Sequence, residues 1–149
     1  MWGQSVLAPL ADLFDSPEGQ HSLVVLDVDH LTRINEELGR ERGDELLADV
    51  EVELATFLTE ATSARWTGDQ YLVLFPHTES RRAASLMRAF MAHLNRPSHA
   101  VRYSLSGGGS TSPTDGTSNR ELVAACATAL ATAKARGRAQ VLWTGSAND

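Results

Sequence analysis

The chain has 149 residues, a formal net charge of −6 and a single cysteine. This length is sufficient for one domain with its own hydrophobic core. The acidic balance argues against a general nucleic-acid binder, and the lone Cys126 excludes an intrachain disulfide and a cysteine-based zinc site. No apolar run approaches the roughly 20 residues that span a bilayer, and the N-terminus lacks the basic region of a signal peptide. We therefore expect a cytoplasmic protein without a membrane segment.

The spacing of apolar residues predicts one α+β domain, in which helices pack on the faces of a mixed sheet. We expect a short helical extension at 1–20, the domain itself at 21–144 and a tail at 145–149. The stretch "GGGSTSPTDGTS" at 107–118 predicts the longest loop. The other predicted elements, in chain order, are a strand at 22–28, helices at 29–39 and 43–58, hairpin strands at 61–66 and 71–75, a helix at 79–95, a strand at 100–106, a helix at 119–136 and a strand at 138–143.

Two carboxylates stand at the end of the first predicted strand, in the sequence "LVVLDVD". Carboxylates at the carboxyl end of a strand can hold Mg²⁺, which prefers one or two of them together with phosphate oxygens and water. Asp27 lies within the apolar run, so we assign it a functional role. Asp29 precedes a helix and has the residue type of an N-cap, so we interpret it as a cap.

Three further stretches contain residue types of nucleotide sites, but each also has a simpler structural explanation. The turn 67–70, "TGDQ", has the glycine and aspartate that a hairpin needs. The cations Lys134 and Arg138 end a predicted helix, where they favour the helix dipole, although they could also clamp a triphosphate. The run "SGGGS" at 106–110 lacks the lysine of a P-loop, and we interpret it as a flexible turn.

Three separated motifs stand out, at 26–47, 64–76 and 129–141: "LDVDHLTRINEELGRERGDELL", "ARWTGDQYLVLFP" and "ALATAKARGRAQV". Together they resemble the GGDEF family, the diguanylate cyclase domain of bacterial second-messenger signalling. The resemblance implies a palm-like, ferredoxin-like α+β fold with a mixed, mostly antiparallel five-stranded sheet. It also implies an activity: in active members, two GTP-loaded domains face each other in a dimer and form cyclic di-GMP and pyrophosphate.

The resemblance assigns metal and catalytic roles to the end of the first strand and to the hairpin. Asp27, the backbone carbonyl of Val28 and Asp69 match the positions that hold Mg²⁺ (or Mn²⁺) in the family. Asp69 and Gln70 match the acidic, catalytic positions of the hairpin after which the family is named. By this resemblance the hairpin holds Asp69 beside Asp27, where a bound cation makes two adjacent negative charges tolerable.

The resemblance also assigns a nucleotide site. Its positions are Asn35, Asp44, Thr67, Gly68, Lys134 and Arg138. The first two match the pair that reads the guanine edge, and the last two match the cations that hold the β- and γ-phosphates. The hairpin positions match residues that the nucleotide approaches closely.

Several departures from the family pattern bear on activity. Thr67 replaces a glycine whose lack of a side chain allows the nucleotide to approach. Gln70 replaces a carboxylate with a neutral amide, so any metal or base function there is lost. Thr32 stands where the family usually has a phosphate-contacting lysine. The Arg-x-x-Asp of the family's inhibitory product site is absent from positions 58–61, which read "LTEA".

Three functions are compatible with this sequence. The preferred one is a degenerate GGDEF domain that binds GTP or a related purine nucleotide with Mg²⁺ and acts as a sensor or interaction module in cyclic-di-GMP-type signalling. The second is a functional but slow diguanylate cyclase, since both principal metal acids are retained. The third is a ligand-free protein-interaction scaffold, although a scaffold has no need of the guanine pair Asn35 and Asp44. The expected partners are the nucleotide and either a weak homodimer or another signalling protein, with no nucleic acid and no membrane.

Overall fold

The computed structural model describes residues 20–96 and 103–145. The order of helices and strands within them agrees with the predicted order. The elements are β1 (His21–Val28), α2 (Leu31–Leu38), α3 (Arg40–Phe57), β2 (Thr62–Arg65), β3 (Gln70–Phe75), α4 (Ser80–Leu94), β4 (Leu105–Ser112), α5 (Asn119–Ala135) and β5 (Val141–Trp143).

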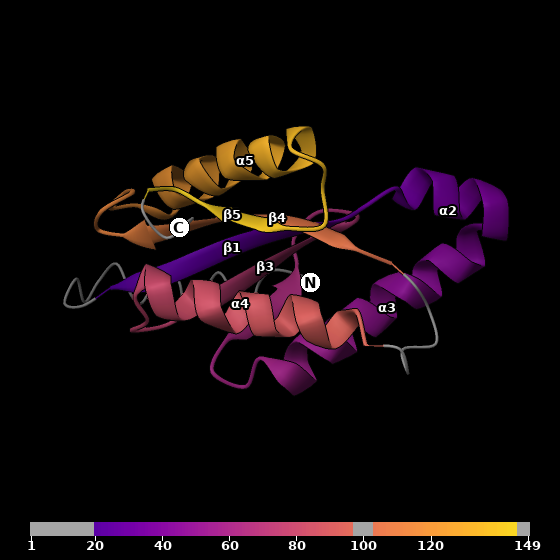
Figure 1. Cartoon of the computed structure of the whole chain (residues 1–149), viewed down its shortest axis with the longest axis horizontal. Helices are drawn as coiled ribbons and strands as arrows, with labels where there is room; N and C mark the ends of the chain where they lie inside the picture. Colours follow the sequence, from indigo (N-terminus) through magenta and orange to yellow (C-terminus); the bar gives the residue numbers. More distant parts are fainter. Residues whose placement is uncertain (1–19, 97–102, 146–149) are drawn as a thin grey trace.

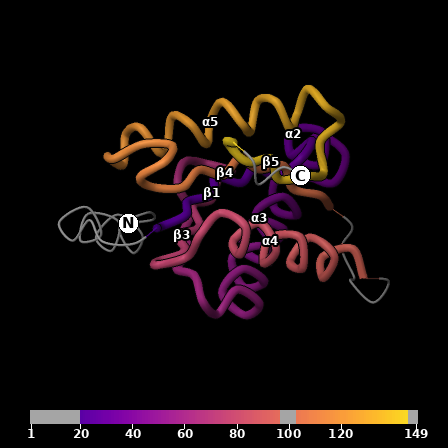
Figure 2. The backbone as a smooth tube through the Cα atoms, turned by 60° about the vertical axis from the view of Figure 1, so that its left-hand side comes forward, coloured from indigo at the N-terminus to yellow at the C-terminus, as the bar shows by residue number. Residues whose placement is uncertain are grey.

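The strands form one mixed sheet in the order β2-β3-β1-β4-β5. All neighbouring pairs are antiparallel except β4 and β5, which are parallel. Helix α5 covers one face of this sheet, while α3 and α4 lie on the other and α2 lies beyond its end (Figures 1 and 2). The predicted α+β class, with a mostly antiparallel five-stranded sheet, is therefore confirmed.

Strand alternation divides the core into two layers. Val24, Leu26 and Val28 of β1 join the larger cluster against α3 and α4, whereas Leu23 and Val25 face α5. Successive side chains of a strand point to opposite faces, so Asp27 falls on the α5 face with Leu23 and Val25. The register of β1 thus directs this carboxylate toward the helix that carries the only lysine in the chain.

The prediction of a strand at 100–106 and a loop at 107–118 was wrong in part, because residues 107–112 of the predicted loop belong to the strand. The strand begins at Leu105 and continues through the glycine run to Ser112, and it pairs with β1 over eight residues. Residues 100–102 lie outside the described part of the chain. The glycines are buried in the sheet because their neighbours leave no space for a side chain: a Cβ at Gly108 would lie 2.0 Å from the carbonyl oxygen of Cys126, on α5.

Other differences are small. Helix α3 begins at Arg40 rather than at 43, and the last strand is shorter than predicted, at 141–143 rather than 138–143. The predicted extension at 1–20 and the tail at 145–149 lie almost entirely outside the described residues. Within 20–96 and 103–145, no helix has both the length and the apolarity needed to cross a bilayer.

Candidate functional site

The end of β1 meets the β2–β3 hairpin because β1 and β3 run antiparallel. In this register Asp27 is the partner of Gln70, the first residue of β3, so the turn that precedes Gln70 lies beside the carboxyl end of β1. The turn is closed by two hydrogen bonds, from the Gln70 amide to the Thr67 carbonyl and from the Trp66 amide to the Gln70 carbonyl, both 2.7 Å long. Gly68 has φ 44°, a left-handed conformation that favours glycine.

Asp27 is 7% exposed, and its two carboxylate oxygens have different surroundings. Oδ2 accepts a hydrogen bond from the Lys134 ammonium, whereas Oδ1 is buried without a hydrogen-bond partner among the described residues. Burial raises the pKa of Asp27 above its ordinary value, and the neighbouring Asp69 carboxylate raises this pKa further, while Lys134 opposes the change. A buried anionic oxygen next to a second carboxylate is an environment that a cation would stabilise.

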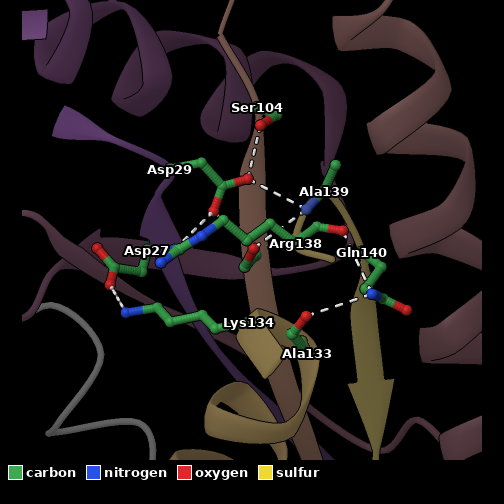
Figure 3. Close-up of polar contacts among 9 residues, drawn as sticks. Asp27, Asp29, Ser104, Ala133, Lys134, Arg138, Ala139 and Gln140 are labelled. Carbon is green, nitrogen blue, oxygen red and sulfur yellow. Dashed lines mark hydrogen bonds and ion pairs between the residues drawn. The ribbon is translucent and has the colours of Figure 1, made fainter. Parts of the chain in front are cut away.

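Helix α5 and the turn after it bring two cations to the carboxyl end of β1. Lys134 lies in the last turn of α5 and pairs with Asp27. Arg138 lies in the turn between α5 and β5, and its Nη1 is 3.8 Å from Oδ1 of Asp29 (Figure 3). The two residues that the sequence marked as possible phosphate ligands are thus paired with the two aspartates of "DVD".

The interpretation of Asp29 as a helix cap was wrong. The N-cap of α2 is His30, and no side chain caps that helix. Asp29 is 3% exposed and accepts hydrogen bonds from the hydroxyls of Ser104 and Ser106, both 2.6 Å long, and from the Ala139 amide at 3.1 Å. A capping side chain accepts hydrogen bonds from backbone amides close to it in sequence. The Asp29 carboxylate instead accepts them from donors 75 to 110 residues away in the chain. The spacing of Ser104 and Ser106, on one side of the chain as it enters β4, was the available signal.

The proposed guanine-reading pair lies in the helix pair α2–α3. Asn35 of α2 packs against Gly43 of α3 so closely that a Cβ at residue 43 would lie 1.7 Å from Asn35 Oδ1. This oxygen is buried and has no hydrogen-bond partner among the described residues. Asp44, the next residue, is exposed. The "GD" of the first motif therefore contains a glycine that makes room for Asn35 and an aspartate that is open to solvent.

The remaining predicted site residues lie either at the surface or in the core. Thr32 and Thr67 are exposed, and the Thr67 hydroxyl is 3.4 Å from Oε1 of Gln70, which accepts its hydrogen bond. The side chain of Val28 enters the core, so only its backbone carbonyl is free to serve as a ligand. In the described ranges no cluster of three or more histidine, cysteine, aspartate or glutamate side chains converges on a metal site.

The structure thus brings Asp27, Asp69, Lys134 and Arg138 to the carboxyl end of β1, with the hairpin turn beside them. The arrangement has two acids, two cations and a buried oxygen that has no hydrogen-bond partner among the described residues, and groups of these kinds can hold a metal-bound polyphosphate.

The family of the chain follows from comparison with known proteins. The model of the family described as "Diguanylate cyclase, GGDEF domain" matches residues 5–140. The chain belongs to the GGDEF family. The cyclic di-GMP phosphodiesterase NbdA of Pseudomonas aeruginosa is 33% identical in an alignment of 122 residues that covers 78% of this chain and 16% of NbdA. The chain spans about a fifth or less of the length of the curated relatives that it matches.

Solved structures show the same GGDEF fold. The GGDEF domain of PA1120 (YfiN or TpbB) from Pseudomonas aeruginosa superposes with a TM-score of 0.83 at 23% identity, over 93% of this chain and 90% of that one. The diguanylate cyclase SiaD of the same species, solved with its activator SiaC, gives 0.84 at 22% identity, over 93% of this chain and 56% of that one. At these identities the likeness establishes the fold alone.

Proposed function

We propose that this GGDEF domain binds GTP or a related purine nucleotide together with Mg²⁺ (or Mn²⁺), has weak or no diguanylate cyclase activity, and acts in cyclic-di-GMP-type signalling. The observation that carries the proposal is the buried, unpaired Oδ1 of Asp27, which lies at the carboxyl end of β1 with Asp69, Lys134 and Arg138. An unpaired buried carboxylate oxygen is costly, and a bound cation would remove that cost.

The residues present fit a divalent cation. Asp27 Oδ1, the Asp69 carboxylate and the Val28 carbonyl are oxygen ligands of the kind that Mg²⁺ prefers, and two carboxylates leave further positions for phosphate oxygens and water. When bound, the ion would neutralise charge on the phosphates. Lys134 and Arg138 would hold the phosphate tail, with Arg138 offering a planar set of N–H donors and Lys134 a single point of charge.

Asn35 and Asp44 support a guanine as the base. Guanine presents N–H donors and a carbonyl acceptor on one edge, and an amide together with a carboxylate complements that edge. The packing of Asn35 on Gly43 holds the amide in one place.

Weak catalysis follows from the charged groups that the hairpin and α2 lack. Gln70 stands where active members have a second carboxylate, and the exposed Thr32 stands where they have a lysine. Removing one preorganised charged group from such a site costs on the order of 10²–10³ in rate. The alternative, a functional cyclase, is favoured by the retention of Asp27 at the end of β1 and of Asp69 in the hairpin turn beside it.

We also propose that the domain works beside other protein segments in the cytoplasm, where GTP is available. Its relatives are several times longer than this chain, and one structurally similar cyclase was solved with an activator protein. Cyclase chemistry in the family requires two domains face to face, so turnover by this chain would depend on a homodimer or on a partner that brings two copies together.

The direct test is a titration with GTP, with and without Mg²⁺, followed on the same samples by chromatography for cyclic di-GMP. We expect Mg²⁺-dependent binding with little or no product. Product at a steady rate would favour a functional cyclase over a domain that only binds the nucleotide, and it would show that catalysis tolerates Gln70. Absence of binding under both conditions would overturn the proposal and leave a protein-interaction scaffold.

Restoring the two missing charged groups should raise activity. We expect the double variant Thr32→Lys, Gln70→Glu to form cyclic di-GMP on the order of 10²-fold faster than the unmodified chain, because each change returns a charged group to the phosphate and metal region. Product formation at high protein concentration is the measurement. The matched control adds Asp69→Asn to the same double variant and should remove the gain. A double variant that binds GTP but shows no gain would place the defect in dimer formation.

A further inference from the structure

The carboxylate of Asp29 joins three segments that are distant in sequence. Only 1% of its side chain is exposed. Ser104 donates to it from the residue before β4, and the Ala139 amide donates to it from the turn between α5 and β5 (Figure 3). Ser106, in β4, donates to its other oxygen. The Asp29 amide also donates to the Ser104 carbonyl at 2.9 Å. A buried carboxylate with this many donors is held in one position.

The turn that Asp29 contacts has an unfavourable backbone. Gly137, Arg138 and Ala139 all have positive φ, at 114°, 67° and 52°. For residues other than glycine this conformation is unfavourable, so it persists only where surrounding contacts enforce it. Two groups accept a hydrogen bond from the Ala139 amide, Asp29 Oδ2 and Ser106 Oγ, each at 3.1 Å. The bond from the Arg138 amide to the Ala133 carbonyl, 2.9 Å long, holds the other side of the turn.

The same carboxylate faces the side chain that this turn presents. Arg138 Nη1 lies 3.8 Å from Asp29 Oδ1, while 37% of the Arg138 side chain is exposed. The contact is an ion pair too long to be a hydrogen bond, so it orients the guanidinium without using up its five N–H donors. Arg138 is therefore held on one side by Asp29 and open to a ligand on the other.

We propose that Asp29 is a positioning residue for Arg138: it fixes the backbone of the 137–139 turn through the Ala139 amide and the guanidinium through the ion pair, so that the phosphate tail of a nucleotide meets a cation already in place. This role rests on the proposed nucleotide-binding function. A cation that is ordered before binding loses less side-chain and backbone entropy when the ligand binds, and the affinity for the ligand is therefore higher.

A purely structural role for Asp29 makes a different prediction. The bonds to Ser104 and Ser106 also join the end of β1 to β4, and a variant that only loosened this junction would weaken every ligand alike. Positioning through Arg138 affects only ligands with the phosphates that Arg138 is proposed to hold. The contrast between GTP and GMP, which lacks the β- and γ-phosphates, therefore separates the two roles.

The experiment is the affinity for GTP and for GMP, both with Mg²⁺, of the unmodified chain, Asp29→Asn, Arg138→Ala and the double variant. We expect Asp29→Asn to weaken GTP about tenfold, the scale of one hydrogen bond to a charged group, and to leave GMP unchanged. In the Arg138→Ala background, Asp29→Asn should cause no further loss, because residues that act as one unit are not additive. Equal loss of GTP and GMP, or additive losses, would overturn the positioning role.

Two milder variants test the same proposal if the Asp29→Asn protein does not fold. Ser106→Ala removes a donor to Asp29 and an acceptor of the Ala139 amide, so it should lower the GTP-to-GMP affinity ratio. Ser104→Ala is the matched control: it removes a hydrogen bond of the same length from the same carboxylate but no contact to the turn, so it should leave the ratio unchanged. Equal ratios in the two variants would overturn the proposal. If the unmodified chain binds neither nucleotide, the proposed function itself fails, and the role of Asp29 fails with it.

Discussion

Asp27→Asn should raise the Tm of the domain at neutral pH and, in the same protein, remove the Mg²⁺ dependence of GTP binding. Asp27 is buried, one of its oxygens has no partner among the described residues, and its pKa is raised by burial and by Asp69. A raised pKa in the folded state means that folding favours the protonated form. Its contribution to stability is therefore present below the unfolded pKa and is lost as the pH rises through the folded pKa.

At neutral pH the ionised Asp27 thus opposes folding, and a neutral amide of the same shape does not. Lys134 loses its partner in this variant, but a third of its side chain is exposed, so water solvates the ammonium. We expect a gain on the order of 1 kcal/mol, or about 2–4 °C in Tm, that shrinks as the pH falls toward the ordinary range of aspartate. Binding of Mg²⁺-GTP should weaken by a factor on the order of 10² or more, as for the loss of a metal ligand.

Thermal unfolding at several pH values and GTP titration with and without Mg²⁺ are the measurements. Glu36→Gln, which neutralises an exposed carboxylate on α2, is the control for a change of net charge and should leave Tm unchanged. A stable Asp27→Asn protein with undiminished Mg²⁺ dependence would remove Asp27 from the metal site. A large loss of stability would mean that the ion pair with Lys134 outweighs the cost of burying the carboxylate.

Gly108→Ala should be among the most destabilising single methyl additions in the chain. A Cβ at this position would lie 2.0 Å from the Cys126 carbonyl oxygen and 2.4 Å from the Leu130 amide nitrogen. Both atoms belong to the backbone of α5, which cannot move aside as a side chain can. Overpacking usually costs 1–3 kcal/mol, and for a contact with backbone we expect about 3 kcal/mol or more, which lowers Tm by roughly 6–12 °C.

Gly107→Ala is the matched control in the same strand. Its Cβ would come closest to Cδ2 of Leu26, at 2.6 Å, and the free end of a leucine side chain can rotate away. Urea unfolding of both variants should show the larger loss for Gly108→Ala. Equal losses would mean that the glycine run is needed for its backbone freedom and not for the approach of α5. Because α5 carries Lys134, a folded Gly108→Ala protein should also bind Mg²⁺-GTP more weakly.

Local pattern was sufficient for most of the fold. Apolar periodicity predicted the order of the helices and strands, and the hairpin at 62–75 was predicted from the small polar turn and the apolar run that follows it. The pattern failed at β4 because glycine has no strand preference of its own. "SGGGS" becomes a buried strand since α5 and Trp143 pack too closely for any side chain, and that constraint comes from residues elsewhere in the chain.

The features of the candidate site also fall into those that the sequence determined and those that only the tertiary structure decided. The sequence by itself determined the residue types at the end of β1, in the hairpin and at the end of α5. That Asp27 lies on the face covered by α5 came from the tertiary structure. Only the tertiary structure decided that Lys134 pairs with Asp27, and that Asp29 accepts hydrogen bonds from β4 and from the turn bearing Arg138 instead of capping α2. The physical reason is that a cap can be recognised from local spacing, whereas the partners of a buried carboxylate depend on which distant donors the packed sheet and helix bring to it.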